Sequence, residues 1–204
     1  MLLERKGKNM WEMKLLGTDL YHLVAAFVIY SMLGGLVESI YMSFCNHKLT
    51  NRGFAKSPFC PIYGFGAVFG YLILSPLRKQ YVLLYIVGAL LATTFEFIVG
   101  KVMIRLFGEL WWDYNDKPFN YKGIICLEST VAWGFYAVGI ICFLHARIYG
   151  LIDMISPRIG IAVISVILII VSIDYVIQLL KAFKVDLSKP KEAIVERYKS
   201  FRAR

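Results

Sequence analysis

Four acidic side chains stand inside long apolar stretches of the sequence: Glu38, Glu96, Glu128 and Asp174. On insertion scales an ionised side chain at the centre of a membrane helix costs roughly 2.5–3.5 kcal/mol, so such residues usually face a bundle interior or a water-filled cavity. If the four carboxylates cluster, their repulsion favours protonation of some of them or the binding of a cation. The chemistry open to them is binding of a cationic substrate, proton relay or acid-base catalysis.

The segments that carry these acids are long enough to cross a bilayer, whose hydrocarbon core of ~30 Å needs about 20 apolar residues in a helix. Five segments meet or approach that length, at roughly 20–44, 59–74, 81–104, 124–145 and 159–180. The chain has 204 residues, of which 58% are hydrophobic and 18% charged, and its mean hydropathy is +0.61, which is too apolar for a soluble domain. We therefore predict an all-α fold, a polytopic transmembrane helix bundle of about five spans, between a polar segment 1–19 and a basic amphipathic tail 181–204.

The second segment is the weakest of the five. It is short, it follows Pro58 and Pro61, and it contains Gly64, Gly66 and Gly70. Membranes tolerate a broken helix only where protein covers the exposed backbone groups. We therefore expect this span to be broken or re-entrant.

All four acids are expected in the same half of the bilayer. The spans that carry them end or begin on one side, and a rise of ~1.5 Å per residue places the acids about 6–13 Å from those helix ends. Small residues share helical rows with two of the acids, which lets another backbone come close. These rows are Gly88, Ala92, Glu96 and Gly100, and Ser31, Gly34, Gly35 and Glu38. The alternatives are a functional cavity lined by acids, and packing seams whose carboxylates pair with Lys101, Arg105 or a backbone amide.

Two connections between spans contain residues that could take part in binding. The connection 46–61 contains Asn51 and Arg52, and a guanidinium can hold a carboxylate or phosphate with two parallel hydrogen bonds. The connection 108–123 contains Trp111, Trp112 and Asp113 among further aromatic and acidic residues. Its rings fit an ordinary belt at the membrane-water boundary. The acidic residues set among them favour the alternative of a folded cap over the acids.

Several function classes find no support in the sequence. The net charge of +9 comes from lysines and arginines that flank apolar segments or gather in the tail, which favours membrane contact over nucleic-acid binding. We expect no metal site or cofactor, because the cysteines form no C-x-x-C pair and have few histidines near them. We read the four, Cys45, Cys60, Cys126 and Cys142, as reduced thiols. The N-terminal residues show no cleaved signal peptide.

Several short segments together resemble one family of bacterial membrane proteins, the CmpB-like ABC-transporter permeases of type IV. They are GGLVES (34–39), NRGF (51–54), PFCPIYGFGA (58–67), TTFEF (93–97) and WWDYNDKPFNYKGIICLES (111–129). The resemblance implies a multi-pass protein of the bacterial cytoplasmic membrane with a role in transport. The matching positions include Glu38, Asn51, Arg52, Glu96, Trp111, Trp112, Asp113 and Glu128, whereas Asp174 lies outside them.

Three functions are compatible with these observations. The first is a permease-like transport subunit whose acids form the substrate or proton site. Any ATP-driven role needs a separate ATPase subunit, because the chain has no G-x-x-x-x-G-K-[ST] phosphate loop, and five spans imply a partner or a homo-oligomer. The second is an intramembrane enzyme acting on a lipid or isoprenoid, although no named catalytic motif is present. The third is a membrane scaffold or sensor whose basic tail binds lipid.

Orientation follows from the distribution of lysine and arginine, which favours the cytoplasmic side. An outside N-terminus places fifteen of these residues in the cytoplasm, and an inside N-terminus places eight there. We therefore predict an outside N-terminus and a cytoplasmic C-terminus, measurable with reporter fusions at both ends. Finding both ends on one side would contradict the count of five spans.

Overall fold

The computed structural model describes residues 10–15, 17–49, 56–108 and 110–183 of the chain. The described part is almost entirely helical, with a small hairpin of β1 (Lys14–Leu15) and β2 (Thr18–Asp19) before the first helix. The helices are α1 (Leu20–Asn46), α2 (Pro61–Leu74), α3 (Tyr81–Phe107), α4 (Leu127–Gly139), α5 (His145–Asp153) and α6 (Pro157–Ala182). The predicted all-α polytopic bundle is therefore confirmed.

Four helical stretches are long and apolar enough to cross a membrane: Leu20–Phe44, Tyr81–Phe107, Leu127–Asp153 and Pro157–Ala182. The third of them joins α4 to α5 through a single π-helical segment, Ile140–Leu144. The second predicted span is the short helix α2, whose 14 residues extend only about 21 Å. A 3-10 turn, η2 (Ser75–Leu77), follows it.

The helices begin and end at residues that satisfy the free backbone groups. Asp19 accepts a hydrogen bond from the backbone N–H of His22 and starts α1, whereas Gly108 ends α3 with a φ of 76°. Helix α4 begins at Leu127, three residues beyond the expected start of the fourth span. The reason is a bridge in which the Tyr121 N–H donates to the Ile125 carbonyl at 2.8 Å, followed by the helix cap at Cys126.

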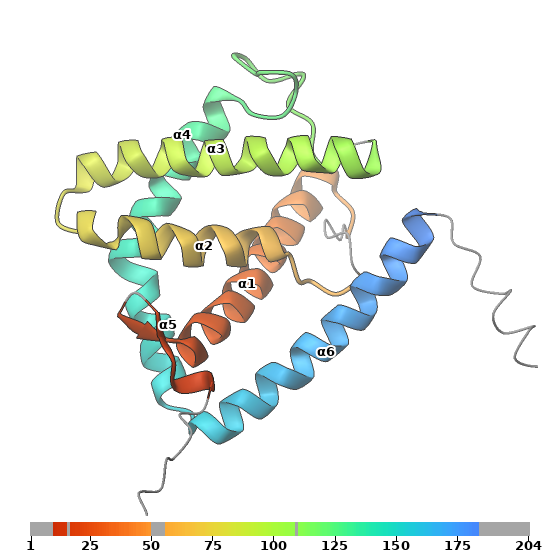
Figure 1. The fold of residues 1–204 in the computed structure, drawn as a ribbon. Helices are drawn as coiled ribbons and strands as arrows, with labels where there is room; N and C mark the ends of the chain where they lie inside the picture. Colours follow the sequence, from red (N-terminus) through yellow and green to blue (C-terminus); the bar gives the residue numbers. More distant parts are fainter. Residues whose placement is uncertain (1–9, 16, 50–55, 109, 184–204) are drawn as a thin grey trace, which may run out of the picture.

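The two rows of small residues are packing seams. In the row on α1, a methyl group on Gly34 would overlap the ring of Tyr63, so α1 and α2 touch closely. In the row on α3, a methyl group on Gly88 would overlap the Ala137 side chain, and one on Gly100 would overlap Ile124. Figure 1 shows α2 and α3 side by side, with α4 crossing α3 and α6 along the edge next to α1.

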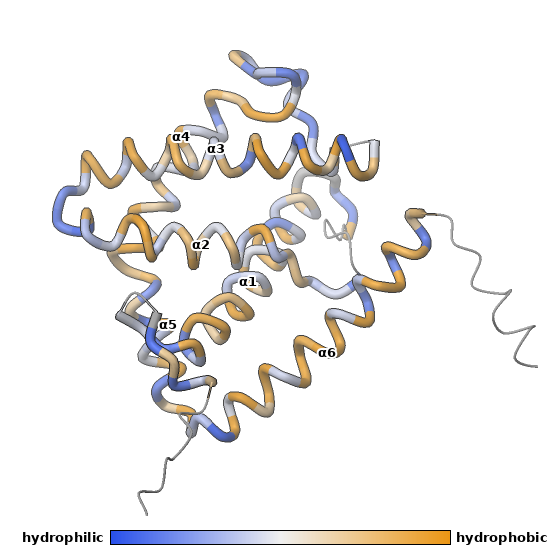
Figure 2. Tube along the Cα trace, in the orientation of Figure 1, coloured by the Kyte–Doolittle hydropathy of each residue, from blue (hydrophilic) through white to orange (hydrophobic). Residues whose placement is uncertain are grey.

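Hydrophobic residues cover most of the helices, and hydrophilic residues gather in the connections (Figure 2). Helix α6 is apolar along nearly its whole length and exposes many of its isoleucines and valines, as expected for a helix in contact with lipid.

The irregular chain before α2 is held by side chains of α6. Asp174 accepts from the Ser57 N–H at 2.8 Å, and the Tyr175 hydroxyl donates to the Phe59 carbonyl at 2.9 Å. The Cys60 N–H donates to the Ser31 carbonyl of α1 at 3.0 Å. These bonds satisfy backbone groups that a bilayer cannot hydrate, which is the condition for a broken helix in a membrane.

Two glycines of α2 give a matched test of the α1–α2 seam. A methyl group at Gly64 would lie 2.6 Å from the Phe27 carbonyl oxygen, whereas one at Gly70 meets nothing within 4 Å. Gly64→Ala should lower the free energy of unfolding by ~1–3 kcal/mol through overpacking. Gly70→Ala should raise it, by at most about 1 kcal/mol, through helix propensity. Thermal unfolding of both variants in detergent measures the difference, and equal melting temperatures would contradict the seam.

Candidate functional site

Glu96 is the acid that the protein surrounds most completely. Its side chain projects from α3 toward α4, and the residue is only 5% exposed. Its Oε1 accepts from the Tyr114 hydroxyl at 3.0 Å, and its Oε2 accepts from Trp133 Nε1 at 3.0 Å. The Ser129 hydroxyl lies 3.3 Å from Oε2. The carboxyl group is thus enclosed by donors from α4 and from the connection before it.

All of these donors are uncharged. In the described part of the chain no lysine or arginine pairs with Glu96, and Lys101 and Arg105 on the same helix are exposed. Ser129 has one hydroxyl proton and two acceptors in reach, Glu96 and the Cys126 carbonyl at 3.0 Å, so its contribution is shared. Ser129 lies in the first turn of α4, where the helix dipole favours negative charge. Among the described residues the carboxyl group therefore has hydrogen-bond donors but no positively charged partner.

Glu38 reaches the same region from α1. The Tyr63 hydroxyl of α2 donates to Glu38 Oε2 at 2.9 Å. The Tyr63 ring packs against the backbone of Gly34, so the seam fixes the position of this donor. Glu38 lies close enough to interact electrostatically with both Glu96 and Tyr114. The structure thus places Glu38 within electrostatic range of Glu96, each held by its own donors.

The connection between α3 and α4 is folded by its own polar side chains. Asp113 Oδ1 accepts from the Asn115 N–H at 2.8 Å, and the Asn120 amide donates to the carbonyls of Asn115 and Lys117. The Tyr114 N–H donates to the Gly123 carbonyl at 3.0 Å. This folding directs the Tyr114 side chain toward Glu96. Burial and the neighbouring Glu96 carboxylate raise the pKa of Tyr114, so its hydroxyl keeps the proton that it donates.

The two predicted tryptophans pack at the base of this connection. Trp112 Nε1 donates to the Ile124 carbonyl at 2.8 Å, and its ring lies against Gly100 of α3. The Trp111 ring lies 5.6 Å from the Phe107 ring, measured between centroids. Neither indole contacts Glu96, so both tryptophans hold the connection against α3.

The other two acids lie apart from Glu96. Glu128 is exposed and pairs with Lys117 Nζ at 2.9 Å, and this pairing raises the pKa of the lysine. Asp174 binds the Ser57 backbone and accepts from the Gln178 amide at 3.2 Å. The predicted residues Asn51 and Arg52 lie outside the described residues, as does the tail beyond residue 183.

A groove lies next to the part of α1 that carries Glu38. This groove of about 760 Å³ runs along the C-terminal half of α1, between residues such as Ile40 and Phe44 and the segment at Lys56 and Pro58. Neither Glu38 nor Glu96 lines this groove. Among the described residues no group of three or more His, Cys, Asp and Glu side chains is placed to hold a metal ion.

Sequence reasoning missed the donors of both glutamates: Tyr63, Tyr114, Ser129 and Trp133. One signal was present, because Ser129 and Trp133 are four residues apart and so share a face of their helix. Which acid that face would meet depends on how α3 crosses α4, and no spacing in the sequence encodes that crossing.

Comparison with known proteins identifies the family. A family model described as "Putative ABC-transporter type IV" matches residues 25–179. No curated protein and no solved structure matches the chain. The family match spans well over half of the chain and covers α2 to α5, most of α1 and α6, and both glutamates with all of their described donors. The chain is thus a multi-pass membrane protein of transporter type and belongs to the "Putative ABC-transporter type IV" family.

Proposed function

We propose that this protein is the membrane subunit of a transport system and that Glu96, with Glu38 beside it, binds a proton or a small cation during transport. The observation that carries the proposal is the buried Glu96 carboxyl group, which has good hydrogen-bond donors but no described basic partner. A charge in such a place is costly unless a proton or cation joins it.

A purely structural role explains this arrangement less well. Interhelical hydrogen bonds in membranes are commonly made by uncharged side chains, which hold helices without the cost of a charge. A glutamine at position 96 has one acceptor oxygen, so it would keep the bond from Tyr114 or the bond from Trp133, whereas the carboxyl group accepts them through separate oxygens. The second carboxylate, Glu38, adds repulsion that packing alone does not require.

The connection before α4 is the proposed cover of this site. Tyr114 joins Glu96 to a loop that has its own internal hydrogen bonds, so the loop can move as a unit. Movement of this loop would remove one donor from Glu96 and expose the carboxyl group to its surroundings. Asn51 and Arg52, which lie outside the described residues, are proposed to contribute from the second polar connection.

The energy source is proposed to be a separate ATPase subunit, as the family description suggests. Five helical segments in one chain are few for a complete pathway, so a partner chain or a homo-oligomer would complete it. The proposed location is the bacterial cytoplasmic membrane, with the C-terminus in the cytoplasm.

Glu96→Gln tests the proposed site directly. Glutamine keeps the size and one of the two acceptor oxygens but cannot carry the proton or the charge. In liposomes that contain the protein and a trapped pH dye or cation dye, we expect Glu96→Gln to lower proton or cation flux by about 100-fold. Glu128→Gln is the matched control, because Glu128 is exposed and paired with Lys117. Wild-type flux in Glu96→Gln would remove Glu96 from the site.

The proposed partner can be tested by purification. The tagged full chain, extracted from its native membrane in mild detergent, should carry with it a second chain that contains a phosphate-loop motif. Mass spectrometry of the purified material identifies that chain. Repeated recovery of the protein without any nucleotide-binding chain, from cells that transport actively, would contradict ATP-driven transport.

A further inference from the structure

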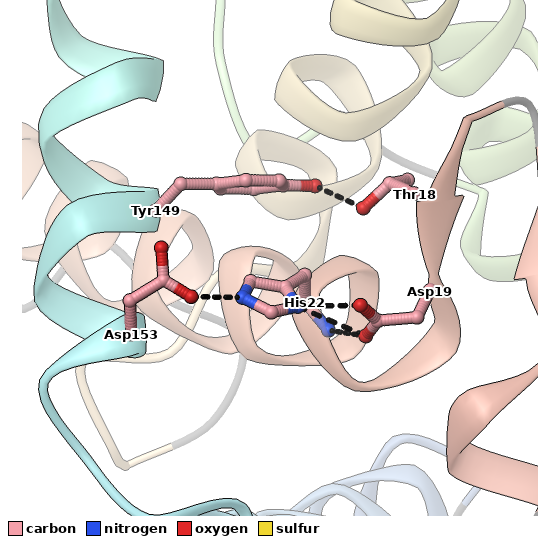
Figure 3. A network of polar contacts seen from close by, with 5 residues as sticks. All are labelled: Thr18, Asp19, His22, Tyr149 and Asp153. Carbon is pink, nitrogen blue, oxygen red and sulfur yellow. Dashed lines mark hydrogen bonds and ion pairs between the residues drawn. The ribbon is translucent and has the colours of Figure 1, made fainter.

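A second polar cluster lies at the opposite end of α1 from Glu38. His22, near the start of the helix, stands between two carboxylates (Figure 3). Its Nδ1 lies 2.8 Å from Asp19 Oδ2, and its Nε2 lies 2.9 Å from Asp153 Oδ1. Burial opposes the ionisation of Asp19, but hydrogen bonds from the backbone and ring of His22 outweigh it and lower the pKa of Asp19. The Asp153 side chain is 68% exposed, so the cluster is open to its surroundings.

A polar row leads from this cluster into the core along α5. Residues four apart share one face of a helix, and His145, Tyr149 and Asp153 have that spacing. Each of the three meets a side chain in or just before α1. The pairs are Asp153 with His22 at 2.9 Å, Tyr149 with Thr18 at 3.2 Å, and His145 with Tyr30 at 3.2 Å. The row extends about 12 Å, from an exposed carboxylate to a histidine that is 3% exposed.

His145 lies in the core with one nitrogen unused. Its ring stacks on Tyr71 with centroids 3.5 Å apart and lies 4.2 Å from the Tyr149 ring. Nδ1 pairs with the Tyr30 hydroxyl, but Nε2 is buried and has no hydrogen-bond partner among the residues that the structure describes. A buried unpaired polar atom costs about 1–3 kcal/mol. Packing and interhelical hydrogen bonding explain the rest of the row but leave this atom unexplained.

The local backbone adds a second sign of function. The π-helical segment Ile140–Leu144 ends immediately before His145, and the His145 N–H donates to the Ile140 carbonyl. Such bulges alter the register of a helix and are frequent at functional sites. The titratable groups that face the His145 ring are Tyr30 from α1, Tyr71 from α2 and Tyr149 from α5. Among the described residues no acid or base contacts the ring, so the imidazole is the basic group of this part of the core.

We propose that His145 is a proton-binding site within the membrane and that protons reach it from His22 and Asp153 along the seam between α1 and α5. With the Nδ1 proton donated to the Tyr30 oxygen, the lone pair of Nε2 accepts a proton relayed through water from a protonated His22 or Asp153, which becomes a neutral imidazole or a carboxylate as His145 becomes an imidazolium. Release of the Nε2 proton restores the neutral ring. The Tyr149 ring lies 5.1 Å from His22 and 4.2 Å from His145, so it packs against both and must move aside to admit the water that relays the proton. This site is separate from Glu96.

The three histidines of the chain allow a direct test by magnetic resonance. Full-length protein labelled with ¹⁵N-histidine is placed in lipid bilayers, and exchange of the ring N–H of His145 with deuterated water is followed. His145→Gln assigns the signal. We expect exchange in the wild type to be fast and to slow by about tenfold in His22→Gln and in Asp153→Asn, because both remove a proton carrier from the seam.

Two controls make the outcome decisive. His47→Asn, at the exposed left-handed cap of α1, and Glu96→Gln should both leave the exchange rate of His145 unchanged. Exchange as slow in the wild type as that of buried backbone amides would overturn the proposal. So would an unchanged or faster rate in His22→Gln and Asp153→Asn. A loss of flux in Glu96→Gln without any effect on His145 exchange would leave the proposed transport site standing by itself.

Discussion

A carboxyl group within the bilayer must obtain its hydrogen bonds from the protein, because the hydrocarbon core has none to offer. Glu96 obtains them from α4 and from the connection that precedes it, so this side chain ties together three consecutive parts of the chain. The close contact of α3 with its neighbours is possible because Gly88, two turns before Glu96, meets Ala137 of α4, and Gly100, one turn after it, meets Ile124 of the connection. The glycines therefore place the carboxyl group within reach of its donors, and packing and chemistry depend on the same seam.

The same requirement explains the short second helix. Pro58 and Pro61 prevent a regular helix from starting earlier, which leaves backbone groups of residues 57–60 without helical partners. Asp174 and Tyr175 of α6 and the Ser31 carbonyl of α1 supply those partners. An acid that the sequence marks as a candidate for transport chemistry thus serves, in the structure, to hold backbone that would otherwise be exposed to lipid.

Sequence reasoning reached the architecture because apolar length is a strong signal, and the helices occupy the expected segments. It also recognised the costly acids, since a charge in an apolar segment is visible without a structure. It could not separate Glu96 and Glu38 from Glu128 and Asp174, because depth along a helix does not specify the neighbouring side chain. The π-helical segment before His145 has no sequence signature either. Because this segment shifts the helical register, a regular α-helical periodicity assigns the residues after it to the wrong face of the helix.

The position of α1 connects the two polar sites. This helix carries His22 near its start and Glu38 sixteen residues later, about 24 Å apart along the axis. It packs against α5 through His22, Thr18 just before it and Tyr30, and against α2 through its glycine seam. The two contacts differ in kind: at the exposed end of α1, water can replace the hydrogen bond of His22 with Asp153, whereas a glycine seam resists displacement because backbones already touch. Any rearrangement of α1 is therefore easier against α5 than against α2, which leaves the geometry of Glu38 with Tyr63 intact while the contacts around His145 change.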